Sequence, residues 1–111
     1  MVCRAYLPAA CSVAAWLAAA CATPEVTPRL HTVAVRNFAF EPGTLEVAVG
    51  DTVVWTNNDV VPHTVTSHSR VWDSGSLAAA AEWRLIVREV GSQPYVCTFH
   101  PNMRGSLVGR D

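Results

Sequence analysis

From residue 31 to the end of the chain, short segments of alternating apolar and polar residues are separated by turn-forming residues. Val33 and Val35 share one face of the first segment, and Thr44 to Val49 alternates in the same way after a Pro-Gly turn. A period of two residues places successive side chains on opposite faces of a strand. Seven or eight such strands, with no helix of convincing length among them, predict an all-β fold, a Greek-key β-sandwich.

The expected strands, in chain order, are 31–36 continued by 38–40, 44–49, 52–56, 63–67, 71–75, 82–88, 94–97 and 105–110. Pro94 cannot donate to a sheet ladder, so the strand that begins there is expected at an edge or a bulge. Residues 77–81 are good helix formers, but the run is too short to be stable alone. Function is therefore expected in loops at one end of the sandwich.

The length and charge of the chain limit its organisation and its partners. A chain of 111 residues, half of them hydrophobic, accommodates one domain, which we place at 30–111 and expect to be a monomer. The formal net charge is -1, and all eight basic residues are Arg. Because a nucleic-acid binder shows a basic stripe, this balance excludes nucleic acid as a partner.

Residues 1–22 differ in kind from the rest and are predicted to be an export signal, followed by a linker at 23–29. Arg4 precedes an apolar run that falls short of the ~20 residues needed to span a bilayer. Ala20 and Ala22 form a small-x-small cleavage pattern, which would release a soluble periplasmic protein. Alternatively, an imperfect lipobox ends before Cys21, whose lipidation would anchor the protein to a membrane. An apolar helix that is never cleaved is the third alternative.

The cysteine count changes its meaning once the leader is set aside. Cys3 and Cys11 lie inside the removable segment and Cys21 at its edge, so the folded domain retains Cys97 alone. A single thiol in an oxidising compartment is a liability unless something occupies it. A disulfide to another chain is one possibility, and a bound metal is the more economical one.

Thiolate, imidazole and thioether side chains follow one another at equal spacing in one predicted loop, as Cys97, His100 and Met103. His63, at the start of a strand far upstream, supplies a fourth donor. Two His and one Cys with a weak axial Met are typical of electron-transfer copper sites, and the mixed set suits both Cu(I) and Cu(II). Structural zinc makes little use of Met, and a c-type haem needs a second Cys before the His.

Taken singly, each of these residues also has an ordinary role. A lone Cys or Met usually fills a core, and a lone His usually makes a hydrogen bond. The joint spacing in an exported β-protein favours the metal site. His31 and His68 have no partner motif, and we assign them no functional role.

Five segments of the chain resemble the cupredoxins, and within them the small plastocyanin and amicyanin group, over the span from Val33 to Gly109. The segments are residues 38–42, 50–57, 62–65, 73–75 and the loop from Cys97 to Met103. The short spacing between His100 and Met103 is that of amicyanin. The resemblance implies a type 1 (blue) copper protein that binds one ion, cycles between Cu(I) and Cu(II), and passes single electrons between larger redox proteins without catalysis.

The resemblance also implies how the site is arranged. His63 and Cys97 would lie within the fold, while His100 would reach the surface where redox partners dock, framed by Pro62, Phe99 and Pro101. Arg104, beside the loop, is a candidate for steering an acidic partner.

Two positions depart from the family pattern. At the strand entry before Cys97 relatives commonly carry Tyr, whereas this chain has Gln93 followed by Pro94. The other departure is at residue 64. Relatives usually place Asn after the first His, where its side chain ties the two ligand loops together, whereas this chain has Thr64. A shorter hydroxyl is expected to make only part of that network, which would affect the reduction potential.

Three other functions fit parts of the same pattern. Copper storage or delivery would use the same ligands without redox cycling. A copper enzyme would need a further His-rich site, for which the two spare His are too few. A metal-free adhesion domain would share the architecture alone.

Overall fold

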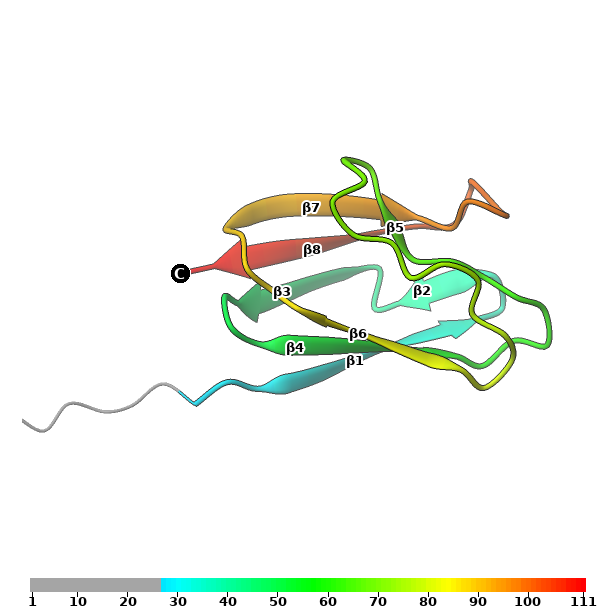
Figure 1. Cartoon of the computed structure of the whole chain (residues 1–111), viewed down its shortest axis with the longest axis horizontal. Coiled ribbons are helices and arrows are strands. Elements are labelled where there is room, and N and C mark those ends of the chain that lie inside the picture. Colours follow the sequence, from blue (N-terminus) through cyan, green and yellow to red (C-terminus); the bar gives the residue numbers. More distant parts are fainter. Residues whose placement is uncertain (1–26) are drawn as a thin grey trace, which may run out of the picture.

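The computed structural model describes residues 27–111, which form eight strands in two sheets that pack face to face (Figure 1). The strands are β1 (Leu30–Arg36), β2 (Ala39–Glu41), β3 (Thr44–Ala48), β4 (Thr52–Asn57), β5 (Thr66–Ser67), β6 (Glu82–Ile86), β7 (Gly91–Val96) and β8 (Arg104–Arg110). No helix that could cross a membrane occurs among the described residues. The predicted cleavage and lipidation positions lie outside them.

The strand order confirms the predicted β-sandwich. One sheet has the order β2-β1-β4-β6 and the other β3-β8-β7-β5. β1 pairs with β4 and β3 with β8 in parallel, and all other neighbours are antiparallel. Parallel neighbours require chain crossings between the sheets, and these crossings bring loops from distant parts of the sequence to the same end.

The alternating pattern of the strands places their apolar side chains between the sheets. Val33 and Val35 of β1 and Leu107 of β8 are fully buried. An aromatic cluster fills the centre, with Trp55 of β4 at 5.5 Å from both Trp83 and Tyr95 between ring centroids. The resulting core is rigid and close-packed, and it supports the loops at one end of the sandwich.

Of the two strands predicted between residues 63 and 75, one is shorter than predicted and the other does not form. β5 contains only Thr66 and Ser67, and 71–75 forms no strand but a single bridge from Asp73 to Thr66. Backbone bonds still join the two segments, from Ser67 N–H to the Trp72 carbonyl at 3.0 Å and from Ser74 N–H to the Val65 carbonyl at 2.9 Å. A side chain interrupts this pairing, because the backbone N–H of Val65 donates to Ser74 Oγ at 2.8 Å. Residues 77–81 form no helix, as expected.

β7 begins at Gly91, three residues before the predicted start, and its pairing with β8 runs without a bulge. Pro94 pairs with Ser106 in that ladder, and on its other side β5 has already ended. The missing N–H of Pro94 therefore leaves no gap between strands, while its carbonyl accepts the N–H of His68 at 3.0 Å. The prediction of a bulge was wrong, and the position is an edge only locally.

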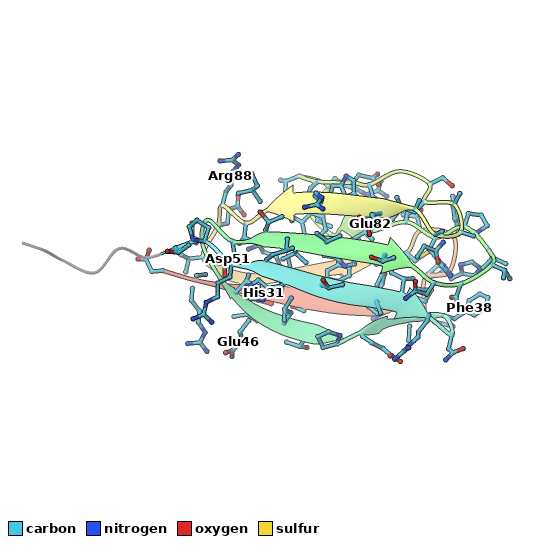
Figure 2. All side chains as sticks on the ribbon, turned by 90° about the horizontal axis from the view of Figure 1, so that it is seen from below. His31, Phe38, Glu46, Asp51, Glu82 and Arg88 are labelled. Carbon is cyan, nitrogen blue, oxygen red and sulfur yellow. The ribbon has the colours of Figure 1, made fainter. Side chains whose placement is uncertain are left out.

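The β1–β2 turn, the β4–β5 loop and the β7–β8 loop lie together at one end of the sandwich (Figure 1). Figure 2 shows Phe38 at this end, with His31 and Asp51 at the opposite end, where the described chain enters β1. Two of these loops carry the four predicted ligands, with His63 in the β4–β5 loop and Cys97, His100 and Met103 in the β7–β8 loop.

Candidate metal centre

Three of the predicted ligands converge at this end of the sandwich. The donor atoms of His63, Cys97 and His100 lie within 4.8 Å of one another. Cys97 Sγ is 3.7 Å from Nδ1 of His63 and also 3.7 Å from Nδ1 of His100. His63 and Cys97 are fully buried, whereas His100 is partly exposed. One thiol and two imidazoles thus face a common point just below the surface.

Backbone hydrogen bonds fold the β7–β8 loop tightly around Cys97, His100 and Met103. The N–H of His100 donates to the carbonyl of Cys97 at 3.2 Å, and the N–H of Met103 donates to the carbonyl of His100 at 2.8 Å. Cys97 N–H then closes the loop onto the carbonyl of Met103 at 3.1 Å. The spacing of three residues therefore has a structural basis, and it leaves the Met103 side chain buried beneath the loop.

His63 lies in the β4–β5 loop, which connects the two sheets, and its backbone position is fixed by a bridge to Leu77. Its N–H donates to the carbonyl of Leu77 at 3.1 Å, and it accepts the N–H of Leu77 at 2.8 Å. Asn57 at the end of β4 adds bonds from its side chain to the carbonyls of Val61 and Leu77, both at 2.9 Å. The loop that carries His63 is thus fastened at both ends.

The spacing of these donors fits a single metal ion. Metal–sulfur and metal–nitrogen bonds of about 2.3 and 2.0 Å at roughly 120° place the donor atoms about 3.7 Å apart, and both sulfur–nitrogen distances are 3.7 Å. Zinc would fit the same spacing. The chemistry of the set, one thiolate and two imidazoles with the thioether of Met103 in the same loop, is the one that suits copper in both oxidation states.

Asp59 fixes the orientation of the His63 ring. Its Oδ2 lies 2.8 Å from Nε2 of His63, so that ring nitrogen donates and the lone pair of Nδ1 is left facing Cys97. The two oxygens of Asp59 also accept the N–H groups of Asn37 at 2.7 Å and Phe38 at 3.0 Å. Burial works to raise the pKa of Asp59, but these hydrogen bonds outweigh it and hold the pKa below the ordinary 3.8.

Phe38 belongs to this site, although it was not among the predicted site residues. Asn37 and Phe38 form the β1–β2 turn with φ of 53° and 59°, a region that a bulky side chain rarely enters. The Phe38 ring meets both imidazoles edge-on, with its centroid 5.3 Å from that of His63 and 4.9 Å from that of His100. Asp59 thus holds a strained turn that places an aromatic ring against both histidines.

Thr64 joins the two ligand loops in the position where relatives carry Asn. Its backbone N–H donates to Cys97 Sγ at 3.3 Å, and its hydroxyl accepts the N–H of Thr98 at 2.8 Å. The hydroxyl also lies within hydrogen-bond distance of the hydroxyls of Thr98 and Thr66. The Thr64 hydroxyl thus ties the His63 segment to the Cys97 loop, and the neighbouring threonines extend its contacts.

The surface around His100 is apolar and hollowed. Pro62, Phe99 and Pro101, the residues predicted to frame it, are exposed, and so is Phe38. A hollow of about 400 Å³ opens beside the His100 ring, lined by Phe38, Phe99, His100, Pro101, Asn102 and Met103. Arg104 is exposed next to it, with Nε directed at the carbonyl of Pro101 at 3.4 Å.

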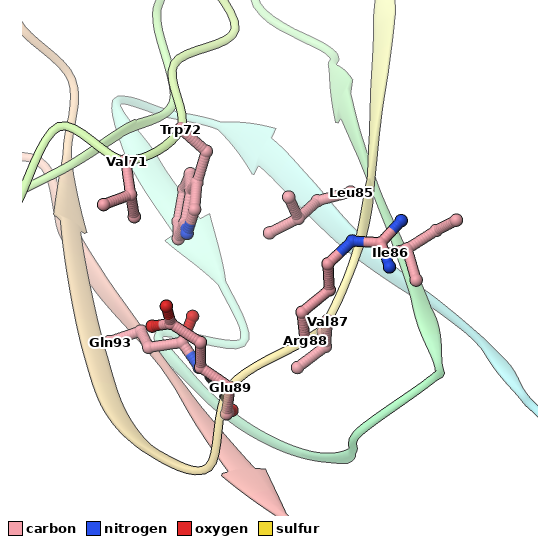
Figure 3. Close-up of a pocket in the computed structure, with 8 residues that line it drawn as sticks. All are labelled: Val71, Trp72, Leu85, Ile86, Val87, Arg88, Glu89 and Gln93. Carbon is pink, nitrogen blue, oxygen red and sulfur yellow. Dashed lines mark hydrogen bonds between the residues drawn. The ribbon is translucent and has the colours of Figure 1, made fainter.

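Other histidines and hollows of the described residues lack such a donor set. His31 pairs with Asp51 at the opposite end, and His68 is exposed. A hollow of about 220 Å³ lies between the Trp72 segment and β6, with the Trp72 ring facing Leu85 (Figure 3). Its polar groups, Arg88, Glu89 and Gln93, offer neither thiol nor imidazole.

Comparison with known proteins agrees with this geometry. The model of the cupredoxin-like domain family matches residues 9–108, which include both segments that carry the three ligands. The amicyanin of Paracoccus denitrificans is 34% identical over 92 residues, covering 78% of this chain and 70% of that protein. The Cu(I) form of an amicyanin variant has a TM-score of 0.70 at 32% identity and covers 78% of this chain and 87% of that one. A purple cupredoxin from Nitrosopumilus maritimus has a TM-score of 0.67 at 26% identity and covers 72% and 99%.

Proposed function

Because the chain belongs to the cupredoxin family, we propose that it is a type 1 copper protein that carries single electrons. The observation that carries this function is the meeting of one thiol and two imidazoles at a point just below an exposed apolar surface. His63, Cys97 and His100 would hold one copper ion, with Met103 as a weak axial ligand. Copper in such a set supplies a one-electron couple between Cu(I) and Cu(II).

The protein's contribution is to keep the donors still and dry while the charge changes. His63 and Cys97 are inaccessible to water, and Asp59 and Thr64 restrain the two ligand loops by hydrogen bonds. Groups that are already in place need little rearrangement when an electron arrives or leaves. This rigidity favours electron transfer over copper storage or delivery, which requires the ligands to release the ion.

The exposed edge of His100 is the proposed exit for the electron. Pro62, Phe99 and Pro101 would form the docking surface for a redox protein, with Phe38 completing its rim. An apolar surface of this kind excludes water on docking and brings the partner close to the imidazole. Arg104 at the margin would favour an acidic partner. No catalytic step is proposed for this site, and we expect the protein to act as a monomer.

The proposed location is outside the cytoplasm. Residues 1–22 carry the pattern of an export signal, and cleavage after Ala22 would leave a soluble periplasmic carrier with a short linker at 23–29. Lipidation of Cys21 would instead tether the same domain to a membrane. Mass spectrometry of the mature N-terminus decides between them, because only the tethered form retains an acylated Cys21.

Voltammetry of the copper-loaded protein separates the carrier from its main alternative. A carrier shows a reversible one-electron couple, and it exchanges electrons rapidly between reduced and oxidised copies. A storage or delivery protein instead shows an irreversible response or loses copper on cycling. Replacing Cys97 by Ser, which is close in size, is expected to abolish the couple, whereas an unchanged couple in that variant would refute the proposed ligand set.

A further inference from the structure

Three threonine hydroxyls lie in a row beside the metal centre, and a carboxylate ends the row. Thr64 Oγ1 is 3.1 Å from Thr98 Oγ1 and 3.0 Å from Thr66 Oγ1. Thr66 Oγ1 then donates to Asp73 Oδ1 at 3.0 Å. The row thus leads from the loop of Cys97, through the segment of His63, to a residue of the 71–75 segment.

Only one arrangement of the hydroxyl protons satisfies these contacts. An ionised carboxylate only accepts, so the single proton of Thr66 is used on Asp73. Thr66 Oγ1 must then accept the proton of Thr64. With its own proton committed, Thr64 Oγ1 accepts from the Thr98 hydroxyl as well as from the Thr98 N–H at 2.8 Å. The carboxylate therefore sets the direction of every bond in the row.

The carboxylate of Asp73 is itself held in place beside the segment that leads from His63 to β5. Oδ1 of Asp73 also accepts the N–H of Gly75 at 2.9 Å, in a turn that Gly75 completes with a φ of 68°. Ser74 Oγ accepts the N–H of Val65 at 2.8 Å and donates a hydrogen bond to the carbonyl of Gly75 at 2.7 Å. Residues 73–75 are thus fastened along the segment between His63 and β5.

We propose that Asp73 is a positioning residue for the metal centre, which acts through Thr66 to fix the hydroxyl of Thr64 as the acceptor that ties the Cys97 loop to the His63 loop. One amide side chain makes this tie in relatives with Asn at position 64. In this chain three hydroxyls and the surface carboxylate of Asp73 connect the two loops. Asp73, which does not touch the ligands, thereby influences their spacing.

The consequence for electron transfer rests on the proposed function. The N–H of Thr64 lies 3.3 Å from Cys97 Sγ. A donor to the sulfur withdraws electron density from the thiolate, and therefore favours Cu(I) and raises the reduction potential. Loosening Thr64 weakens that bond, so cutting the row is expected to lower the potential without removing a ligand.

Hydrogen exchange in the copper-free protein tests the row itself. Thr66→Val removes one hydroxyl at nearly constant shape and leaves the bond between Asp73 and Gly75 intact. We expect the N–H of Thr98 to exchange about threefold to tenfold faster, the change for one modest hydrogen bond. Thr32→Val, at an exposed position on β1, is the matched control and is expected to leave that rate unchanged.

Variants of Asp73 approach the same row from its far end. Asp73→Ala is expected to reproduce the faster exchange at Thr98. Asp73→Asn is expected to keep the wild-type rate, because an amide oxygen still accepts from Thr66. These changes lie on the surface, so they keep the test open if Thr66→Val fails to fold. Wild-type exchange at Thr98 in Asp73→Ala would overturn the proposal.

A double-mutant cycle separates this role from a general loss of packing. Once Thr64→Val has removed the central hydroxyl, Thr66→Val is expected to change neither the exchange at Thr98 nor the potential of the copper-loaded protein. Additive effects would mean that Thr66 acts by packing alone, contrary to the proposal. If copper gives no type 1 spectrum while exchange still responds, the proposed function fails and the positioning role stands.

Discussion

Two histidine–aspartate pairs lie at opposite ends of the sandwich with the same geometry. In one, Asp59 Oδ2 is 2.8 Å from His63 Nε2, and in the other Asp51 Oδ2 is 2.8 Å from His31 Nε2. Both carboxylates also accept two backbone N–H groups, from Asn37 and Phe38 in the first case and from Arg29 and Ala48 in the second.

The difference between the pairs lies in what the second ring nitrogen faces. Nδ1 of His63 points at Cys97 Sγ, and the ring is fully buried. His31 is 22% exposed and lies at the end where the chain enters β1 (Figure 2). The one thiol of residues 27–111, Cys97, follows β7 at the other end. The Asp51–His31 pair is thus a structural contact, whereas the Asp59–His63 pair orients a metal ligand. The difference is the nearby sulfur of Cys97.

Removing the imidazole of His63 or of His31 is expected to give the largest difference between the two pairs. His63→Ala is expected to lower copper affinity by more than about 100-fold, since loss of a ligand exceeds the cost of losing its hydrogen-bond partner. His31→Ala is expected to leave affinity unchanged while reducing stability. Competition with a chelator of known affinity measures both variants, and equal losses would contradict the distinction between the pairs.

Neutralising each carboxylate gives the next largest effect. Asp59→Asn is expected to weaken copper binding about tenfold and to raise the reduction potential, because a neutral amide favours the charged Cu(II) state of the site less. Asp51→Asn should alter neither quantity. Voltammetry and chelator competition on the two variants make the test, and a potential unmoved by Asp59→Asn would refute the orienting role.

The structural pair should show itself in the acid stability of the protein. The N–H of Arg29, followed by the ring of His31, lowers the pKa of Asp51 from 3.8 to about 2. The ionised carboxylate therefore stabilises the fold above its ordinary pKa, and this contribution is lost as the pH falls from 3.8 toward 2. Urea unfolding of Asp51→Asn should give a lower free energy at neutral pH and a flatter acid limb. A limb as steep as that of the wild type would contradict this.

The smallest effect is expected at the ring that only the metal end possesses. Phe38→Ala removes an exposed edge contact to His63 and His100 and leaves the ligands in place. Electron self-exchange is expected to slow by roughly threefold, as for a modest interface contact, with the visible spectrum unchanged. Val90, exposed elsewhere, supplies the control Val90→Ala.

The sequence was sufficient for the sandwich, because strand alternation is a local signal, and for Cys97 and His100, because their spacing within one loop is local too. His63 lies 34 residues from Cys97 and was predicted from its position at a strand start and from the family resemblance. Phe38 escaped prediction because its position depends on Asp59, 21 residues away in the chain, and on a positive φ that no local signal indicates for Phe. Asp51 as the partner of His31 was missed for the same reason.

The segment between His63 and Gly75 shows where pattern alone misleads. Its β-branched residues predicted two strands, yet only two backbone bonds join the segments, and the N–H of Val65 donates to the Ser74 side chain. Polar side chains compete with backbone pairing in this way when the chain turns back on itself within a few residues. The same segment places Asp73 at the end of the row of hydroxyls that begins at Thr98.

Addition of Cu(II) to the metal-free protein, followed by visible absorption, tests the central claim most directly. One equivalent of copper is expected to produce an intense charge-transfer band from the Cys97 thiolate, the blue colour of a type 1 site, and no such band in the Cys97→Ser variant. A colourless Cu(II) complex, or a band that persists without Cys97, would contradict the assignment.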